Sequence, residues 1–85
     1  MANVIVYSGP GCPYCDRAKA LLRKKGVAFR EIDVRADKSQ LSDMMSKTGG
    51  RKSIPQIFIN DRYVGDCDEL HALDAQGKLD PLLAS

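Results

Sequence analysis

Long apolar runs are absent from this 85-residue sequence, and no segment approaches the length that crosses a membrane. The first apolar run, over residues 4–7, is too short for the hydrophobic part of a signal peptide, and no basic residue precedes it. We therefore expect a cytoplasmic protein. Repeats and low-complexity tracts are also lacking, and the length predicts a single domain over residues 1–85.

The sequence has little net charge and few cysteines. The formal net charge is only +2, which is too small to indicate binding to nucleic acid or to an anionic membrane. Three cysteines form an odd set, whereas secreted disulfide scaffolds carry more cysteines in even number. These thiols are therefore expected to be reduced in the cytosol and to react transiently.

The sequence does contain two cysteines separated by two residues, in Cys12-Pro13-Tyr14-Cys15. This spacing can hold a zinc ion, close a tight disulfide or carry out redox exchange. Pro13 suits the first position of a helix, which would place Cys12 at the N-cap. Free N–H groups and the positive end of the helix dipole then favour the thiolate of Cys12, while Cys15 lies one turn inside and is shielded.

Hydrophobic periodicity and turn residues predict the order β-α-β-α-β-β-α-α. A helix follows the cysteine motif and ends at Gly26, and Asp37 with Gln40 resembles a capping box that opens a second helix. Asp66 with Glu69 resembles another capping box. Strands are expected over residues 3–7, 27–34, 56–59 and 63–65, and helices over 13–25, 38–48, 67–76 and 81–83.

This order indicates an α/β fold in which a βαβ unit joins a β-hairpin, giving a four-stranded mixed sheet with helices on both faces. A doubly wound nucleotide-binding fold would need more strands and a glycine-rich phosphate loop, and both are missing.

Three short segments give the chain a family resemblance: Cys12-Pro13-Tyr14-Cys15, Ser53-Ile54-Pro55 and Gly65-Asp66-Cys67-Asp68. They resemble the signatures of the glutaredoxins, above all the short bacterial dithiol members of the glutaredoxin-three type, which are also similar over residues 17–22, 55–59 and 72–75. The resemblance implies a thioredoxin-like fold and a glutathione-dependent thiol–disulfide oxidoreductase. Such an enzyme reduces protein disulfides and glutathione mixed disulfides, maintains cell redox balance and donates electrons to reductases.

The resemblance also implies a role for each matched residue. Cys12 would be the nucleophile and Cys15 the resolving thiol, Pro55 would be cis, and the Ile54 backbone would pair with the cysteinyl part of glutathione. The γ-glutamyl end would bind at the N–H groups of Cys67 and Asp68, with the Asp68 carboxylate taking its ammonium. The remaining contacts implied are Arg51 and Gln56 near the glycyl carboxylate and Tyr14 beside the groove.

The family further implies that glutathione is a co-substrate and that no bound cofactor is needed. Expected partners are glutathione and disulfide-containing or glutathionylated proteins, with the chain itself a monomer. Two positions depart from the family pattern: Gly9 stands where many relatives carry a lysine, and Asp66 replaces the second glycine of a Gly-Gly pair. The carboxylate of Asp66 could repel glutathione, or it could cap the helix and point away.

Two other classes of function are weighed against the enzyme. Cys12, Cys15, Cys67 and His71 could be imagined as a Cys₃His zinc site, although Pro13 and helix capping already explain the first two. Iron–sulfur cluster carriage is known among some glutaredoxins, but carriers usually have a smaller or more flexible residue in place of Pro13. Cys67 itself is interpreted as a small apolar group at a helix start rather than as a third redox site.

Overall fold

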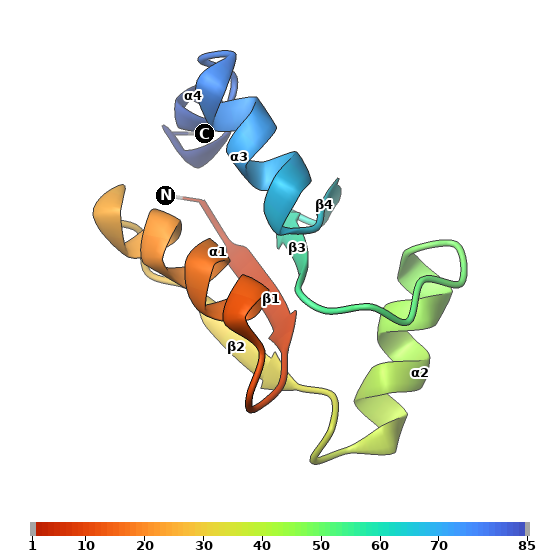
Figure 1. The fold of residues 1–85 in the computed structure, drawn as a ribbon. Coiled ribbons are helices and arrows are strands. Elements are labelled where there is room, and N and C mark those ends of the chain that lie inside the picture. Colours follow the sequence, from red (N-terminus) through yellow and green to blue (C-terminus); the bar gives the residue numbers. More distant parts are fainter. Residues whose placement is uncertain (1, 85) are drawn as a thin grey trace.

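A computed structural model describes residues 2–84 of the chain (Figure 1). The elements follow the predicted order: β1 (Val4–Ser8), α1 (Pro13–Lys24), β2 (Arg30–Asp33), α2 (Lys38–Lys47), β3 (Gln56–Ile59), β4 (Arg62–Gly65), α3 (Cys67–Ala75) and α4 (Leu79–Ala84). No helix in the described part of the chain is both long enough and apolar enough to span a membrane.

The four strands form one mixed sheet in the order β2-β1-β3-β4. β1 pairs with β2 in parallel and with β3 antiparallel, and β3 pairs with β4 antiparallel. This confirms the predicted βαβ unit joined to a hairpin. Because β1 lies inside the sheet and is held on both edges, the loop that leaves its C-terminal end is placed firmly.

Alternate residues of β1 belong to two separate apolar clusters, as the period of a strand requires. Val4 and Val6 pack with α1, α3 and α4, and the fully buried Leu22 belongs to the same cluster. Tyr7 packs on the other face with Phe58 of β3 and with Met44, the one fully buried residue of α2 among those described. Helices therefore cover both faces, with α2 set apart from the other three (Figure 1).

Helix starts follow the sequence signals with two differences, one at α2 and one at α4, which begins at Leu79 instead of at residue 81. Cys12 is the N-cap of α1 and Pro13 its first residue, as predicted. At α2 the N-cap is Asp37, but its carboxylate accepts hydrogen bonds from the N–H and hydroxyl of Ser39, at 2.9 and 2.6 Å, rather than sharing a capping box with Gln40. Ser39 lies two residues after Asp37 and provides two donors, its N–H and its hydroxyl, so the Asp37 carboxylate bonds to Ser39 and forms no capping box with Gln40.

The second strand is shorter than the predicted range 27–34. It occupies Arg30–Asp33, because Val27 and Phe29 pack against the core around α1 instead of joining the sheet. The Val27 N–H donates to the Leu22 carbonyl at 3.2 Å and so closes the end of α1. The hairpin is as predicted, with Asn60 and Asp61 both at positive φ in its turn.

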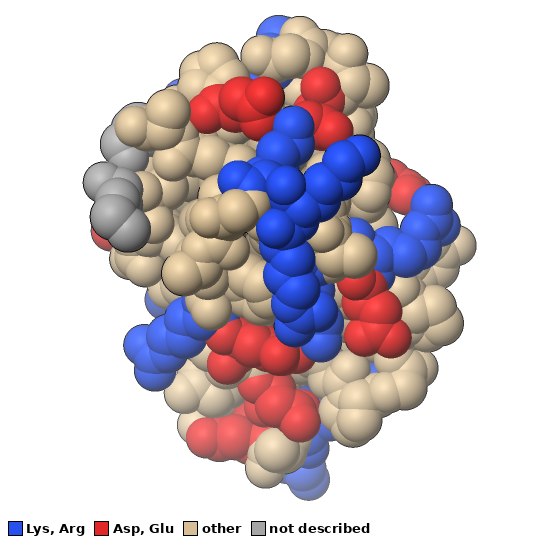
Figure 2. Space-filling view, turned by 90° about the vertical axis from the view of Figure 1, so that its left-hand side faces the viewer, with Lys and Arg blue, Asp and Glu red and all other residues tan. Residues whose placement is uncertain are grey.

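Charges of both signs are mixed on the side of the molecule where α1 and β2 lie. Figure 2 shows a band of basic side chains across the middle of this face with acidic side chains along its borders. Lys19 of α1 pairs there with Glu31 of β2 at 2.8 Å. This side therefore carries no uniform basic surface of the kind that binds a nucleic-acid backbone.

Candidate active site

The two motif cysteines lie at the start of α1, after the loop that connects it to β1. They are joined in a disulfide with their Cα atoms 5.2 Å apart. The Cys12 sulfur is the N-cap group and accepts a hydrogen bond from the Cys15 N–H at 3.1 Å. Cys12 is 8% exposed and Cys15 is fully buried. The pair is therefore asymmetric in the predicted sense, with the outer sulfur at the helix N-terminus and the inner one enclosed.

A second loop, which precedes β3 and is 42 residues away in sequence, lies beside Cys12. The Ile54–Pro55 bond is cis, as the sequence resemblance predicts. The Ile54 carbonyl oxygen lies 3.9 Å from the Cys12 sulfur. Backbone polar groups next to Pro55 are therefore presented beside the sulfur, where an extended peptide could pair with them.

A groove of about 310 Å³ opens between this loop, the start of α1 and the start of α3. We name it the α3 groove. Five of the seven residues predicted to contact glutathione line it: Tyr14, Ile54, Pro55, Cys67 and Asp68. Ser53 and Asp66 complete the lining. Tyr14 is 54% exposed at its edge. The N-terminus of α3, with its free N–H groups, also borders this groove and favours a carboxylate there.

Arg51 and Gln56, the other two predicted contacts, do not line the α3 groove. Arg51 donates to the Tyr63 hydroxyl at 2.6 Å, to Glu69 at 2.8 Å and to Asp66 at 3.0 Å. Gln56 is fully buried; its amide nitrogen donates to the Ser53 carbonyl at 2.9 Å, and its amide oxygen accepts from Tyr63 at 2.6 Å. Both side chains therefore hold the cis-proline loop against β4 and α3.

Asp66 caps α3, as one of the two possibilities from the sequence requires, and it also lines the α3 groove. Its carboxylate accepts from the Glu69 N–H at 3.0 Å, and the Glu69 side chain accepts from the Asp66 N–H at 3.1 Å, so the predicted capping box is confirmed. Arg51 balances both carboxylates. Gly65 is required beside them: its φ is +126°, and a Cβ there would lie 2.5 Å from the Glu69 carboxyl carbon.

Cys67 and His71 form a local contact within α3. The Nδ1 atom of His71 lies 2.8 Å from the Cys67 carbonyl oxygen and 3.5 Å from its sulfur. Burial is the main cause that raises the pKa of the Cys67 thiol. Within residues 2–84 no three His, Cys, Asp or Glu side chains are grouped as metal ligands. The four-residue zinc site considered from the sequence is thus not assembled among the described residues.

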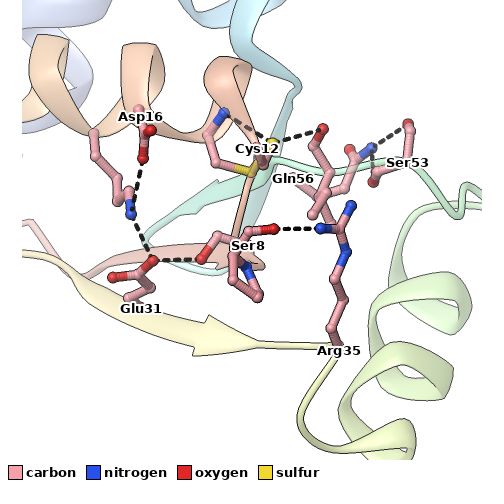
Figure 3. The surroundings of a disulfide bond; sticks show 11 residues. Ser8, Cys12, Asp16, Glu31, Arg35, Ser53 and Gln56 are labelled. Atoms are coloured by element: carbon pink, nitrogen blue, oxygen red, sulfur yellow. Dashed lines mark hydrogen bonds and ion pairs between the residues drawn. A yellow bond between two sulfur atoms is a disulfide. The ribbon is translucent and has the colours of Figure 1, made fainter.

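Polar contacts fix the end of β1 beneath the cysteine loop (Figure 3). The fully buried Ser8 donates to Glu31 at 2.5 Å, and Lys19 reaches the same carboxylate oxygen at 2.8 Å. The hydrogen bond from Lys19, followed by that from Ser8, holds the pKa of Glu31 below its usual value. This carboxylate therefore ties β1, β2 and α1 together directly under the active-site loop.

Sequence reasoning missed one residue at this loop, Arg35. Its side chain crosses Gly9, and its guanidinium donates to the Pro10 carbonyl (Figure 3). A Cβ at position 9 would lie only 2.8 Å from the Arg35 Cδ atom. The signal that could have found it is the glycine itself: Gly9 stands where the family resemblance implies a lysine, and it leaves room for the Arg35 side chain.

Comparisons with known proteins agree with this geometry. The glutaredoxin family model matches residues 4–64. Glutaredoxin 3 of Escherichia coli strain K12 is 52% identical over 98% of this chain and 99% of its own length. The solution structure of glutaredoxin from Brucella melitensis is 53% identical with a TM-score of 0.86, covering 98% of this chain and 89% of the other.

A more distant structure shares the fold as well. The crystal structure of a buckwheat glutaredoxin–glutathione complex is 27% identical with a TM-score of 0.89, covering 98% of this chain and 77% of the other. The thioredoxin-like fold expected from the sequence is therefore confirmed. A cysteine pair at a helix N-terminus, a cis-proline loop beside it and these matches together show that the chain belongs to the glutaredoxin family of thiol–disulfide oxidoreductases.

Proposed function

We propose that the chain reduces glutathione mixed disulfides and protein disulfides, with glutathione as electron donor and without a bound cofactor. The observation that carries the proposal is the asymmetry of the cysteine pair. Cys12 caps α1 with its sulfur 3.9 Å from the carbonyl oxygen of Ile54, a residue that lines the α3 groove, whereas Cys15 is fully buried. An outer thiolate beside a groove can attack a bound disulfide, and an inner thiol can then displace the product.

Glutathione is proposed to lie along the α3 groove. The free N–H groups at the start of α3 suit its γ-glutamyl carboxylate, and the exposed Asp68 carboxylate, which lines the same groove, suits its ammonium. Backbone groups of Ile54 beside Pro55 suit its cysteinyl amide groups, and Tyr14 flanks the sulfur. Arg51 and Gln56 serve this site indirectly, because their hydrogen bonds hold the cis-proline loop in place.

Two routes use the cysteines differently. In the monothiol route the Cys12 thiolate attacks the glutathione sulfur of a mixed disulfide, the reduced substrate leaves as thiolate, and a second glutathione thiolate frees Cys12 as glutathione disulfide forms. In the dithiol route Cys12 attacks a protein disulfide and releases one substrate thiolate. Cys15 then attacks the Cys12 sulfur, the second substrate thiolate leaves, and the Cys12–Cys15 disulfide forms.

The partners proposed are glutathione and proteins that carry disulfides or glutathionylated cysteines, acted on by a monomer in the cytoplasm. A reducing compartment suits such chemistry because it regenerates the thiol pair after each turnover.

The cysteine roles separate by mutation. Cys12→Ser should abolish turnover of both substrate classes. Cys15→Ser should retain deglutathionylation and lose reduction of protein disulfides, because only the dithiol route uses the inner sulfur. The measurement is a glutathione-coupled assay on a small glutathione mixed disulfide, run beside reduction of a protein disulfide. If Cys15→Ser also lost the monothiol reaction, the proposed division of roles would be wrong.

A further inference from the structure

Tyr63 lies at the centre of a series of hydrogen bonds that ends on the loop beside Cys12. Arg51 donates to the Tyr63 hydroxyl at 2.6 Å, and this hydroxyl donates to the side-chain oxygen of Gln56 at 2.6 Å. The Gln56 amide nitrogen in turn donates to the carbonyl of Ser53 at 2.9 Å and to its hydroxyl at 3.2 Å (Figure 3). We name these four side chains the Tyr63 network.

The direction of the hydrogen bonds in the Tyr63 network is fixed by the groups at its two ends. A guanidinium can only donate, so the single proton of Tyr63 must point to Gln56. At the other end the Ser53 carbonyl can only accept, so Gln56 must turn its nitrogen to Ser53 and its oxygen to Tyr63. Burial is the main cause that raises the pKa of Tyr63 above its ordinary value of 10.0, so the hydroxyl keeps its proton at neutral pH. Tyr63 therefore selects one orientation of the Gln56 amide.

The orientation of the Gln56 amide matters because this amide holds the turn beside the reactive sulfur. Gln56 is fully buried and follows Pro55 directly, and its side chain folds back to Ser53. The carbonyl of Ile54, which lies between them in sequence, is 3.9 Å from the Cys12 sulfur. An amide turned the other way would set its oxygen against the Ser53 carbonyl, and two acceptors that face each other would displace the turn.

The other end of the Tyr63 network is anchored at the start of α3. Arg51 donates to Glu69 at 2.8 Å and to Asp66 at 3.0 Å, the two residues of the α3 capping box. Without the Tyr63 hydroxyl, Arg51 would still bind these carboxylates but would lose its hydrogen-bonded connection with Gln56. The hydroxyl therefore fixes the turn before β3 relative to the N-terminus of α3, and the α3 groove opens between these two parts of the chain.

Tyr63 does not itself line the α3 groove. Its ring packs against Phe58, with the ring centroids 5.2 Å apart, and it lines a separate pocket of about 400 Å³. Any effect of its hydroxyl on bound glutathione must therefore pass through Gln56 or Arg51. We propose that Tyr63 is a positioning residue for glutathione mixed disulfides, because through Gln56 it holds the turn at Ile54 where the glutathione part binds. The proposal rests on the function proposed above.

The test compares the parent protein with Tyr63→Phe, which keeps the ring and removes the hydroxyl. In the glutathione-coupled assay we expect the KM for the glutathione–cysteine mixed disulfide to rise about fivefold, the size of effect that one neutral hydrogen bond produces. The kcat should change by less than about twofold, because a displaced binding turn weakens the ground state and the transition state alike. The reduced proteins should react equally fast with neutral 2,2′-dithiodipyridine, which reports the reactivity of Cys12 itself.

Tyr7→Phe is the matched control. Tyr7 belongs to the same aromatic cluster, with its ring centroid 5.7 Å from that of Phe58, but its hydroxyl donates to Asp43 of α2. Both substitutions remove a hydroxyl from a tyrosine that packs on Phe58, so a general loss of stability, measured by urea unfolding, would affect both variants. The KM of Tyr7→Phe should stay within about twofold of the parent value.

The side-chain amide of Gln56 gives a direct reading of the Tyr63 network. In ¹⁵N-resolved NMR spectra of the parent protein its two protons should be protected from exchange with water, because the amide is buried and bonded to Ser53. We expect Tyr63→Phe to reduce this protection about tenfold or more and Tyr7→Phe to retain it. This signal reports the orientation of the amide independently of any enzymatic assay.

Three results would overturn the proposal. An unchanged KM in Tyr63→Phe would mean that the hydroxyl does not position the glutathione site. An equal rise in Tyr7→Phe would assign both effects to general loosening of the aromatic cluster. Slower reaction of Tyr63→Phe with 2,2′-dithiodipyridine would mean that the hydroxyl acts on the Cys12 thiol and not on the binding turn. Failure of the proposed function would show separately, as absence of glutathione-coupled turnover in the parent protein, and would remove this proposal with it.

Discussion

Cys12 and Cys67 both stand at the start of a helix, yet their surroundings differ. Cys12 is the N-cap, its sulfur accepts a backbone N–H bond at 3.1 Å, and the residue lines a groove of about 560 Å³ between the starts of α1 and α2. Cys67 is the first residue within α3 and is only 2% exposed, and burial raises its pKa. The helix dipole can therefore stabilise a thiolate at Cys12, while the protein disfavours one at Cys67.

This difference predicts selective alkylation of the reduced protein. Iodoacetamide should modify Cys12 already at neutral pH, with an apparent pKa below the ordinary thiol value of about 8.5, and should leave Cys15 and Cys67 unmodified. Peptide mass mapping over a series of pH values identifies the site. Modification of Cys12 only above about pH 8 would contradict the role of the helix N-terminus, and equal labelling of Cys67 would contradict its enclosure.

Asp68 provides a second test at the scale of one residue. Asp68→Ala should raise the KM for glutathione mixed disulfides several-fold and change kcat little, because a contact with the distant ammonium stabilises ground and transition states about equally. Asp68→Asn, which keeps the shape and removes the charge, should give most of the same loss. A fall in kcat that matched the rise in KM would assign Asp68 to the structure of α3 instead.

The sequence predicted the structural positions of those site residues that lie within a short recognisable motif. The N-cap position of Cys12 follows from Pro13, and the cis bond before Pro55 follows from a family motif. The surroundings of Arg51 could not be predicted in this way, because its partner Asp66 is distant in sequence and joins it only in the folded chain. The same holds for Arg35, which reaches back to the loop at Pro10.

At the scale of the elements, the start of α3 joins the glutathione site to the rest of the fold. Asp66 and Glu69 form a reciprocal capping box, and Arg51 links both carboxylates to the segment before the cis-proline. The orientation of α3 at the α3 groove therefore depends on the Asp66 side chain, which stands where the family resemblance implies a glycine.

Asp66→Ala should lower the free energy of unfolding by about 1 kcal/mol, since the N-cap bond is lost, whereas Asp66→Gly should cost only a few tenths. Urea denaturation of the three proteins measures this difference, with the slope expected to be unchanged. Both variants should also raise the KM for glutathione substrates, because Arg51 loses a partner. An alanine variant as stable as the parent would show that the cap contributes nothing.

Element boundaries were predicted well where caps and turns act locally and less well where packing decides. The N-caps at Cys12, Asp37 and Asp66 follow from short motifs. The second strand was predicted too long, since Val27 and Phe29 have the apolar character of a strand but serve the core beside α1. An apolar pattern shows that a side chain is buried, and it does not show against which element it packs.

At the scale of the whole molecule, the sheet separates two apolar clusters, and polar contacts join the elements at its edge. Glu31 of β2 is the clearest of these, because its carboxylate accepts from Lys19 of α1 and from Ser8 of β1. Both cysteines follow directly from the β1 end. The charge on Glu31 therefore stabilises the fold as a whole and the support of the active-site loop in particular.

The contribution of Glu31 should depend on pH with a defined sign. Its folded pKa lies below the ordinary value of 4.5, chiefly because of the Lys19 hydrogen bond, so the carboxylate favours the folded state once it is ionised. The stabilisation is complete above about pH 4.5 and is lost as the pH falls through the lower folded value. Glu31→Gln keeps an acceptor for Ser8 and removes the charge.

We expect Glu31→Gln to lower the free energy of unfolding by roughly 0.5–1 kcal/mol at pH 7, a modest value because the Glu31 side chain is 41% exposed and solvent screens the pair. The gap between the two proteins should close as the pH falls through the lowered folded pKa of Glu31, because the parent carboxylate then becomes protonated as well. Urea unfolding at a series of pH values, with Asp61→Asn at the exposed hairpin turn as control, measures it. A gap that stayed constant down to low pH would mean that the substitution acts through packing rather than through charge.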